Sequence, residues 1–267
     1  MKILRYLLLI AILLVMVFPL FWMFRVSLLP TGSGLTPKDL IGPSITMSIY
    51  YDIATSGNML KYFINSTVVG MIVTGGNILF CFMAGYAFSR FKFIGKNILF
   101  YSVILVLMIP AHILIIPLYL LMFHLGLYDT YAALILPFLV NPIGIFLIKQ
   151  YIDTLPSSME EAARIDGAGE FHILLRVVMP LCKPALAVLA IQVFLTNWNS
   201  FLFPFILTGS DSVRTLPVGL ALYQGHQAID WQHLMAGSAL AVIPVLVIFL
   251  FFQRQIVSGI TAGAIKQ

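Results

Sequence analysis

Residue types that carry out enzyme chemistry occur in this 267-residue chain, but their spacing matches no catalytic or metal-binding motif. Cys81 and Cys182 form no CxxC pair and are expected to be buried as small apolar residues. None of the five histidines belongs to an HExxH sequence; they are His112, His124, His172, His226 and His233. Gly95-Lys96 lacks the upstream glycine of a phosphate-binding G-x-x-x-x-G-K-[ST] loop. The sequence therefore predicts a protein that is not an enzyme and binds no metal or cofactor of its own.

Uncharged polar residues recur on one face of a predicted helix in the last third of the chain. Gln192, Thr196 and Asn199 stand at positions i, i+4 and i+7, which share a face of an α-helix. Amides and hydroxyls suit a neutral, hydroxyl-rich solute, but they also commonly hydrogen-bond a neighbouring helix in membrane proteins. The sequence leaves both roles open, a solute pathway and helix packing. Leu189 and Phe194 lie off this face and are expected to contact lipid.

Apolar elements must position these residues, because 61% of the chain is hydrophobic and only 9% is charged. Soluble domains carry about 25% charged residues, so the charged residues here are too few to cover a soluble protein of this length. The composition also excludes a disordered chain and a small disulfide-rich domain. Basic residues are scattered singly, which argues against binding of nucleic acid. The chain is predicted to be an integral membrane protein in contact with the lipid bilayer.

Six stretches without Asp, Glu, Lys or Arg are long enough to cross a bilayer core about 30 Å thick, which takes about 20 apolar residues as helix. They are Tyr6–Phe24, Tyr62–Ser89, Asn97–Leu127, Thr130–Ile148, Pro184–Ser210 and Leu234–Gln253. Runs of this length predict helices, since the strands of membrane barrels are short and alternating. The third run contains Pro110 and Pro117 and is expected to be kinked. We therefore expect an all-α integral membrane protein with six transmembrane helices.

The distribution of basic residues predicts how these helices are oriented. One set of connecting segments and termini holds most of them: Lys2, Arg5, Arg90, Lys92, Lys96, Lys149, Arg164, Arg176, Lys183, Arg254 and Lys266. The opposite set holds only Lys38, Lys61 and Arg214, while Arg25 could reach the interface from the outer end of the first helix. The positive-inside rule then places both termini in the cytoplasm. No A-x-A-like cleavage site follows the first run, so we expect it to be a retained helix and not a signal peptide.

The cytoplasmic loop between the fourth and fifth stretches, about residues 152–182, carries the most informative local pattern. Ser157 with Glu160, or Ser158 with Glu161, forms a capping box that predicts the start of a helix. A helix of about nine residues is marginal alone in water, so packing against the rest of the chain must hold it. Its alanine-rich surface would let another protein approach closely.

Glycine and proline predict where the helices of this loop end. The first helix is expected to end at Gly167, because glycine suits the left-handed conformation of a helix end. A second helix is expected to follow and to end at Pro180. Its predicted apolar face consists of Phe171, Leu174, Leu175 and Val178.

The loop resembles the EAA loop of ABC importer permeases, the inner membrane components of binding-protein-dependent transport. Glu161-Ala162-Ala163 is followed after three residues by Gly167, and after nine more by Val177-x-Met179-Pro180. The family pattern has Ile and Leu where Val177 and Met179 stand, and both changes are conservative. This spacing identifies the chain as similar to that family.

Two other segments resemble the carbohydrate-uptake branch of the family, specifically the second permease subunit of maltose-type importers. The first is Asn197-Trp198-Asn199-Ser200-Phe201-Leu202-Phe203-Pro204, in which the branch usually has Glu where Ser200 stands. The second is the tail Ser258-Gly259-Ile260-Thr261-Ala262-Gly263-Ala264-Ile265-Lys266. The resemblance implies that residues 1–267 form one permease domain for a sugar or oligosaccharide.

The resemblance also implies partners and roles for particular residues. Glu161, Ala162, Ala163, Gly167 and Pro180 would form a surface that docks on a cytoplasmic ATPase and couples its motion to the helices. The partners would be a second permease subunit, two copies of the ATPase that binds ATP, and an extracytoplasmic solute-binding protein at a bacterial-type inner membrane. Two alternatives stay open: a permease of the same superfamily for a non-sugar solute, and a six-helix intramembrane enzyme.

Overall fold

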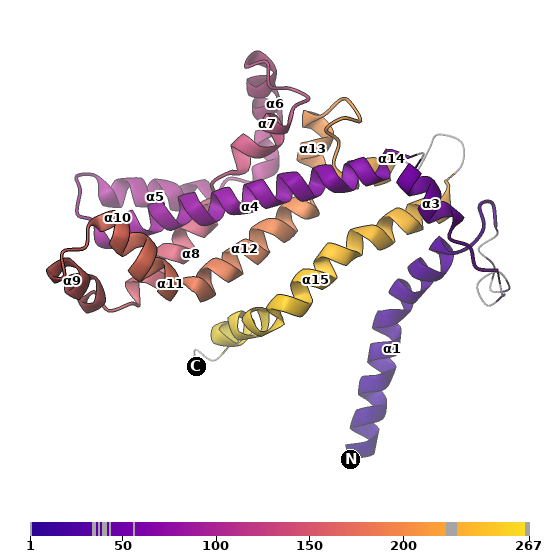
Figure 1. Ribbon diagram of the computed structural model, residues 1–267, viewed down its shortest axis with the longest axis horizontal. Helices are drawn as coiled ribbons and strands as arrows, with labels where there is room; N and C mark the ends of the chain where they lie inside the picture. The colour runs from indigo at the N-terminus through magenta and orange to yellow at the C-terminus, as the bar shows by residue number, and fades with distance from the viewer. Residues whose placement is uncertain are drawn as a thin grey trace. The chain divides into compact units, whose positions relative to one another are not determined.

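The computed structural model describes residues 2–33, 36, 38, 42, 44–55, 57–222 and 229–264, and the side chains of those between 3 and 253. Regular structure in these ranges is helical, without a strand (Figure 1). The chain divides into two compact units, Met1–Asn65 with Arg214–Leu246 and Ser66–Val213 with Val247–Gln267. The long helices α4 (Met59–Arg90) and α15 (Trp231–Ala264) each contribute to both units. The predicted all-α membrane fold is confirmed.

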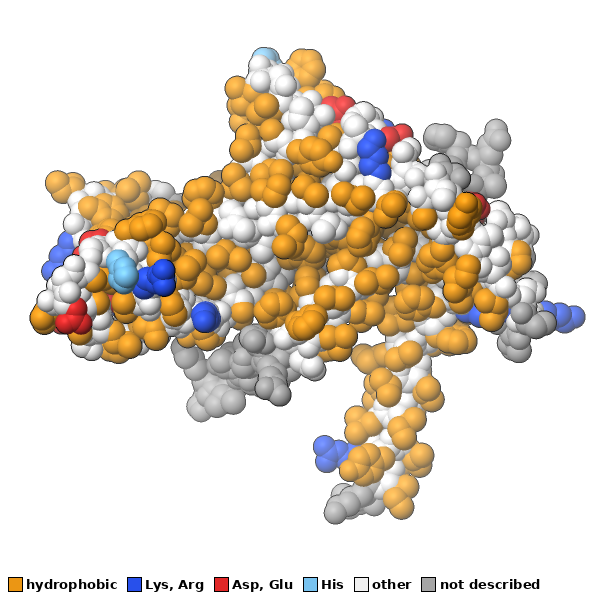
Figure 2. All heavy atoms as spheres, in the orientation of Figure 1, with side chains coloured by type: hydrophobic (Ala, Val, Ile, Leu, Met, Phe, Trp, Pro, Cys, Tyr) orange, Lys and Arg blue, Asp and Glu red, His pale blue; other side chains and the backbone are white. Residues whose placement is uncertain are grey.

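The first unit contains a long apolar helix that is buried only at its C-terminal end, at Val26 and Ser27. Its helices besides α4 and α15 are α1 (Lys2–Ser27), α3 (Ser48–Thr55) and α14 (Leu216–Leu222). No residue in the most apolar 18-residue window of α1 is buried, and Figure 2 shows hydrophobic side chains along it. At its end, Arg25 donates hydrogen bonds to the carbonyl oxygens of Ser44 (3.1 Å) and Gly42 (2.6 Å). The apolar surface of α1 is therefore available to lipid or to another chain.

The second unit contains most of α4 and the helices that follow it as far as residue 213. These are α5 (Lys96–Val106), η1 (Ala111–Leu114), α6 (Ile115–His124), α7 (Tyr131–Ile135), η2 (Leu136–Phe138), α8 (Pro142–Asp153), α9 (Ser158–Ile165), α10 (Glu170–His172), η3 (Ile173–Val178), α11 (Met179–Leu181), α12 (Lys183–Trp198) and α13 (Leu202–Leu207). In its core, a Cβ built on Gly144 of α8 would come within 2.9 Å of Cys81 Sγ on α4 and 2.8 Å of Leu189 on α12. Small residues thus let these three helices approach closely. Cys81 and Cys182 are both buried free thiols, as predicted.

Four helices are long and apolar enough to cross a membrane: Ile3–Ser27, Met59–Arg90, Tyr131–Asp153 and Trp231–Gln253. The total reaches six if each of two bent pairs is one span. The first pair is Lys96–Val106 with Ala111–His124, bent by 92°, and the second is Glu170–Leu181 with Lys183–Trp198, bent by 79°. Length and composition of the described residues thus give four to six crossings. The exact number of six stays a prediction.

Proline explains the bend in the first pair. Pro110 directly precedes η1 and has an extended ψ of 121°, which breaks the path from α5 to α6. The predicted kink is confirmed at this residue. Pro117 stands in the first turn of α6, where a helix needs no N–H donor, and it does not interrupt the helix.

The second bend lies at Cys182, between α11 and α12. Pro184 cannot donate to the carbonyl oxygen of Pro180, and in a continuous helix its ring would clash with that carbonyl. The chain therefore starts a new helix, α12, in another direction.

Proline also shortens the predicted fifth span. The stretch Pro184–Ser210 is not one helix, because α12 ends at Trp198 and α13 begins at Leu202. Pro204 would clash with the carbonyl of Ser200 if the helix ran through, whereas in the first turn of α13 it is tolerated.

Candidate functional site

The first helix of the predicted coupling loop, α9, begins at Ser158, as predicted, but without the predicted capping contacts. Ser157 precedes the helix, but its side chain accepts no hydrogen bond from a backbone N–H. Its hydroxyl instead donates to Glu161 Oε1 at 2.9 Å. Both predicted capping boxes are wrong: Ser157 and not Ser158 stands at the N-cap, and Glu160 is buried against a charged partner on another helix.

The end of α9 is as predicted. Gly167 has a φ of +85°. The N–H of Gly167 donates to the carbonyl of Arg164 at 3.0 Å, and that of Ala168 donates to the carbonyl of Ala163 at 2.9 Å. This pair of bonds is the Schellman motif of a left-handed helix end. A Cβ on Gly167 would meet no atom within 4 Å, so glycine is favoured here by backbone conformation and not by crowding.

The second helical stretch, through α10, η3 and α11, contains a π-helical turn. Ile173 and Val178, five residues apart, are both buried, together with Leu174. Phe171 was predicted to share an apolar face with Leu174 and Val178, but it is 68% exposed while they are buried, so that grouping is wrong. The wider π turn changes which residues share a face. The prediction that Pro180 ends the helix is also wrong, because α11 continues to Leu181 and the break comes before Pro184.

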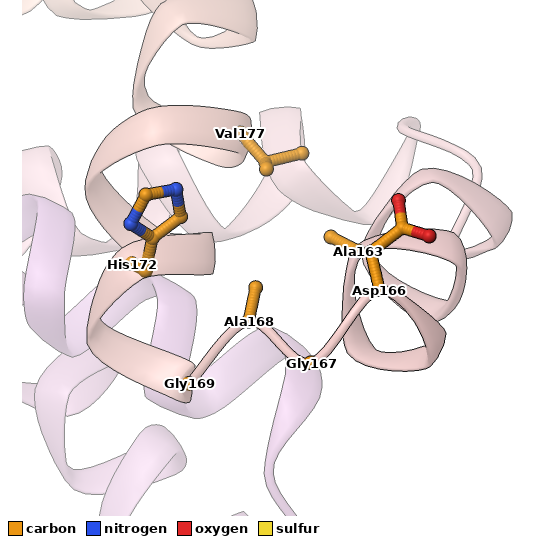
Figure 3. Close-up of a pocket in the computed structure, with 7 residues that line it drawn as sticks. All are labelled: Ala163, Asp166, Gly167, Ala168, Gly169, His172 and Val177. Carbon is orange, nitrogen blue, oxygen red and sulfur yellow. The ribbon is translucent and has the colours of Figure 1, made fainter.

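An open hollow of about 500 Å³ lies between α9 and the stretch that follows it (Figure 3). Its lining residues are Ala163, Asp166, Gly167, Ala168, Gly169, His172 and Val177. In Figure 3 the Asp166 carboxylate and the His172 imidazole stand on opposite sides, with the small Ala168 side chain between them. Small lining side chains leave room for a side chain or loop of another protein.

Beside the hollow, the loop exposes large apolar side chains. Ile165 is 86% exposed, and Met159 and Phe171 are also exposed. Glu161 and Ala162, from the predicted docking motif, are exposed on the same helix. Exposed apolar side chains gathered in a loop between helices indicate a surface that another protein covers.

The buried face of α9 is joined to the end of α4 by charged hydrogen bonds. Arg90 Nε donates to Glu160 Oε1 at 2.7 Å, and Arg90 Nη2 donates to the carbonyl of Leu155 at 2.8 Å. The Tyr86 hydroxyl lies 3.3 Å from Glu160 Oε2 and 3.4 Å from Glu170 Oε2. This cluster was not predicted from the sequence. Its visible signal was a basic residue at the end of a predicted span and the first of two successive glutamates in the loop.

A second ion pair bridges α9 and α10 at the surface. Arg164 Nε donates to Glu170 Oε1 at 2.7 Å, and Arg164 Nη2 donates to Glu170 Oε2 at 3.0 Å. These hydrogen bonds raise the pKa of Arg164 above its usual range. Both side chains are well exposed, so the pair adds about 1 kcal/mol or less to stability.

The predicted polar stripe lies on the least buried side of α12. Gln192 is half-buried, and Thr196 and Asn199 are exposed. Asn199 stands just past the helix end, where its Nδ2 donates to the Leu195 carbonyl at 2.8 Å. Among the described residues, the side chains of Gln192 and Thr196 have no hydrogen-bond partner.

The residues expected to face lipid lie instead in the protein core. Leu189 is fully buried and Phe194 is 7% exposed, and the Phe194 ring stacks on Trp198 at 5.6 Å between centroids. The prediction of lipid contact is wrong, because α4 and α8 cover this side of α12 through their small residues. Gly70 of α4, for example, faces Phe194 and Asn197.

Comparison with known proteins gives one family. The family described as "Binding-protein-dependent transport system inner membrane component" matches residues 76–261. The arabinooligosaccharides transport system permease protein AraQ of Bacillus subtilis is 36% identical over 255 residues, which cover 93% of this chain and 90% of AraQ. The trehalose transport system permease protein SugB of Mycobacterium tuberculosis is 34% identical, over 93% of this chain and 92% of SugB. A bacterial ABC transporter involved in the import of the acidic polysaccharide alginate has a chain with the same fold, with a TM-score of 0.81, 24% identity and 95% coverage of both chains.

Proposed function

The chain belongs to the family of binding-protein-dependent transport system inner membrane components, and we propose that it is one of two permease subunits of an ATP-driven importer for a sugar or oligosaccharide. One observation carries the proposal: identity of 34–36% over 93% of the chain with permeases named for arabinooligosaccharides and trehalose. Both the family description and the apolar helices indicate a protein that crosses the inner membrane several times. We assign residues 1–267 to a single permease domain with both termini in the cytoplasm.

Energy for transport would come from partner subunits. The sequence has no G-x-x-x-x-G-K-[ST] loop for ATP phosphates, so we assign ATP binding to a cytoplasmic ATPase and no cofactor to this chain. Permeases of this family work with a second permease, an ATPase and a solute-binding protein. We propose a heterodimer of permeases, each docked on one of two ATPase copies.

The exposed side of the loop would form the docking surface for the ATPase. Glu161 and Ala162 present a charge and a small side chain beside the hollow, and Ala163 and Gly167 line the hollow itself. Pro180 lies in the helical stretch that ends at the bend into α12. A movement of this loop caused by the ATPase would therefore be transmitted to α12 through a single short connection.

The polar stripe supports a place for α12 along the solute pathway. The half-buried Gln192 amide and the exposed Thr196 hydroxyl have no hydrogen-bond partner among the described residues; such groups are costly against lipid, so another surface or water must cover them. A partner permease that faces Gln192, Thr196 and Asn199 would enclose a polar seam. Neutral amides and hydroxyls suit sugar hydroxyls because no counter-charge has to be neutralised.

Uptake by cells tests the assignment of the solute. We expect that deletion of the gene abolishes accumulation of one radiolabelled sugar among arabinotriose, trehalose and maltose, and that the cloned gene restores it. Uptake of glycerol 3-phosphate and of dipeptides serves as control. If only a non-sugar solute is lost, the chain is a permease of the same family for that solute, and the sugar assignment is wrong.

A further inference from the structure

We propose that Arg90 and Glu160 are positioning residues that lock the coupling helix α9 to the end of α4, so that both helices move as one body during the ATP cycle. This inference rests on the proposed docking of the loop on an ATPase. It concerns the opposite face of α9, which that docking leaves covered. Neither residue is part of the predicted docking motif.

The contact is buried and directional. The Glu160 side chain is 4% exposed and that of Arg90 is 15% exposed, with 2.7 Å between Nε and Oε1. A carboxylate removed from water in this way needs a charged partner, because leaving it alone would be far more costly than breaking a surface pair. The pair therefore resists separation much more than the exposed Arg164–Glu170 pair does.

One guanidinium holds two points of the loop at once. Arg90 contacts Glu160 through Nε and the carbonyl of Leu155 through Nη2. Leu155 lies before α9 and Glu160 lies in its first turn, so the entry to the helix is fixed from both sides. Arg90 is the last residue of the 32-residue helix α4, so the lock joins the loop to a long, rigid element.

The Tyr86 hydroxyl extends the lock to the next helix. It stands one turn before Arg90 on α4, within reach of both Glu160 and Glu170. A hydroxyl carries one hydrogen, so it donates to one carboxylate at a time. Glu170 is in turn held by Arg164 of α9. Through these contacts α4, α9 and α10 form one connected cluster.

A merely stabilising ion pair would behave differently from a lock. Replacement of a buried pair by apolar side chains of similar volume is often neutral or stabilising. The double variant R90M/E160M should therefore insert and assemble, and it removes only the directional bonds. The charge swap R90E/E160R restores an ion pair of opposite sense but not the bond to the Leu155 carbonyl, because a carboxylate cannot donate; it therefore tests the ion pair alone.

Distance measurement between spin labels tests the lock without a transported solute. Labels at Lys92→Cys, just after α4, and Ser158→Cys, at the start of α9, are both exposed, while the native thiols are buried. The complete importer in lipid would be measured without nucleotide and after trapping with Mg-ATP and vanadate. We expect one narrow distance in both states for the native chain, loss of that single distance in R90M/E160M, and its return in R90E/E160R.

The control variant K149M removes the ion pair within α8, keeps the bond between Ser89 of α4 and Asp153, and should leave the narrow distance unchanged. A native distance that shifts between the two states, or an R90M/E160M complex that keeps the narrow distance, would overturn the lock. Co-purification of the ATPase is measured in parallel. Loss of docking in the native complex would contradict the proposed function itself, whereas retained docking with a shifted distance contradicts only the lock.

Discussion

The two faces of α9 use adjacent glutamates for opposite purposes. Glu160 is buried and bound to Arg90, while Glu161 is exposed and hydrogen-bonded only by Ser157 among the described residues. One face thus holds the helix to its own chain, and the other is left for a partner. The role of a glutamate in this loop therefore depends on which face of α9 its side chain occupies and not on the residue type.

The largest effect on stability is expected from the buried face. Glu160→Ala leaves the Arg90 guanidinium in a poorly hydrated site without its carboxylate, at a cost of about 3 kcal/mol. Glu161→Ala removes only an exposed contact and should change stability by about 0.5 kcal/mol or less. Thermal unfolding of the two variants in detergent checks the difference. Equal melting temperatures would show that the faces do not differ in this way.

A smaller loss is expected from the turn that ends α9. Gly167→Val places a branched side chain at a φ of +85°, which costs about 1–2 kcal/mol, and should abolish uptake by misdirecting the docking surface. Gly95, between α4 and α5, is the matched control, since it has a φ of +79° and equally open space around its Cβ position but does not line the hollow. Gly95→Val should therefore lose a similar amount of stability but keep uptake. Normal uptake by Gly167→Val with a normal ATPase complex would contradict the coupling role.

Substitutions on the exposed face of α9 should weaken assembly with the ATPase with little effect on the stability of the chain. Glu161→Lys reverses a charge and Ile165→Asp places a carboxylate where an 86% exposed apolar side chain stands. Both should change the free energy of unfolding by about 0.5 kcal/mol or less but weaken retention of the ATPase during purification. Full retention in both variants would place the docking surface elsewhere.

The smallest effect on stability is expected along the polar stripe, where the readout is chemical access. Cysteine at Thr196 or Asn199 should react with a small water-soluble thiosulfonate reagent, at a rate that changes when the complex cycles with ATP. Leu13→Cys on α1 is the control for lipid exposure, and Leu189→Cys is the control for burial. If the cysteines at positions 196 and 199 do not react in any state, the stripe packs against another helix.

Local features were predictable from the sequence, and contacts between distant residues were not. The kink at Pro110 and the left-handed end at Gly167 depend on the residue itself, so the sequence was sufficient. Glu160 was assigned to a capping box because its true partner, Arg90, lies 70 residues away in the chain. The docking role of the loop residues and the role of the polar stripe stay predictions.

In two places, helix periodicity alone did not predict which apolar side chains are buried. An ideal α-helical repeat grouped Phe171 with Leu174 and Val178, but Phe171 is exposed because the π turn in η3 alters the repeat. On α12 the repeat grouped Gln192, Thr196 and Asn199, but it could not show that α4 and α8 cover the side that carries Leu189 and Phe194. Leu189 and Phe194 were assigned to lipid for that reason.

Cross-linking from the exposed face of α9 tests most directly that this surface docks on the ATPase. A photo-reactive residue would replace Ala162, which is exposed beside the hollow, in the assembled importer. A matched residue would replace Ile94, which is fully exposed between α4 and α5. We predict a covalent adduct with the ATPase, identified by mass spectrometry, from position 162 and none from position 94. No adduct at 162, or equal adducts at both positions, would contradict the assignment.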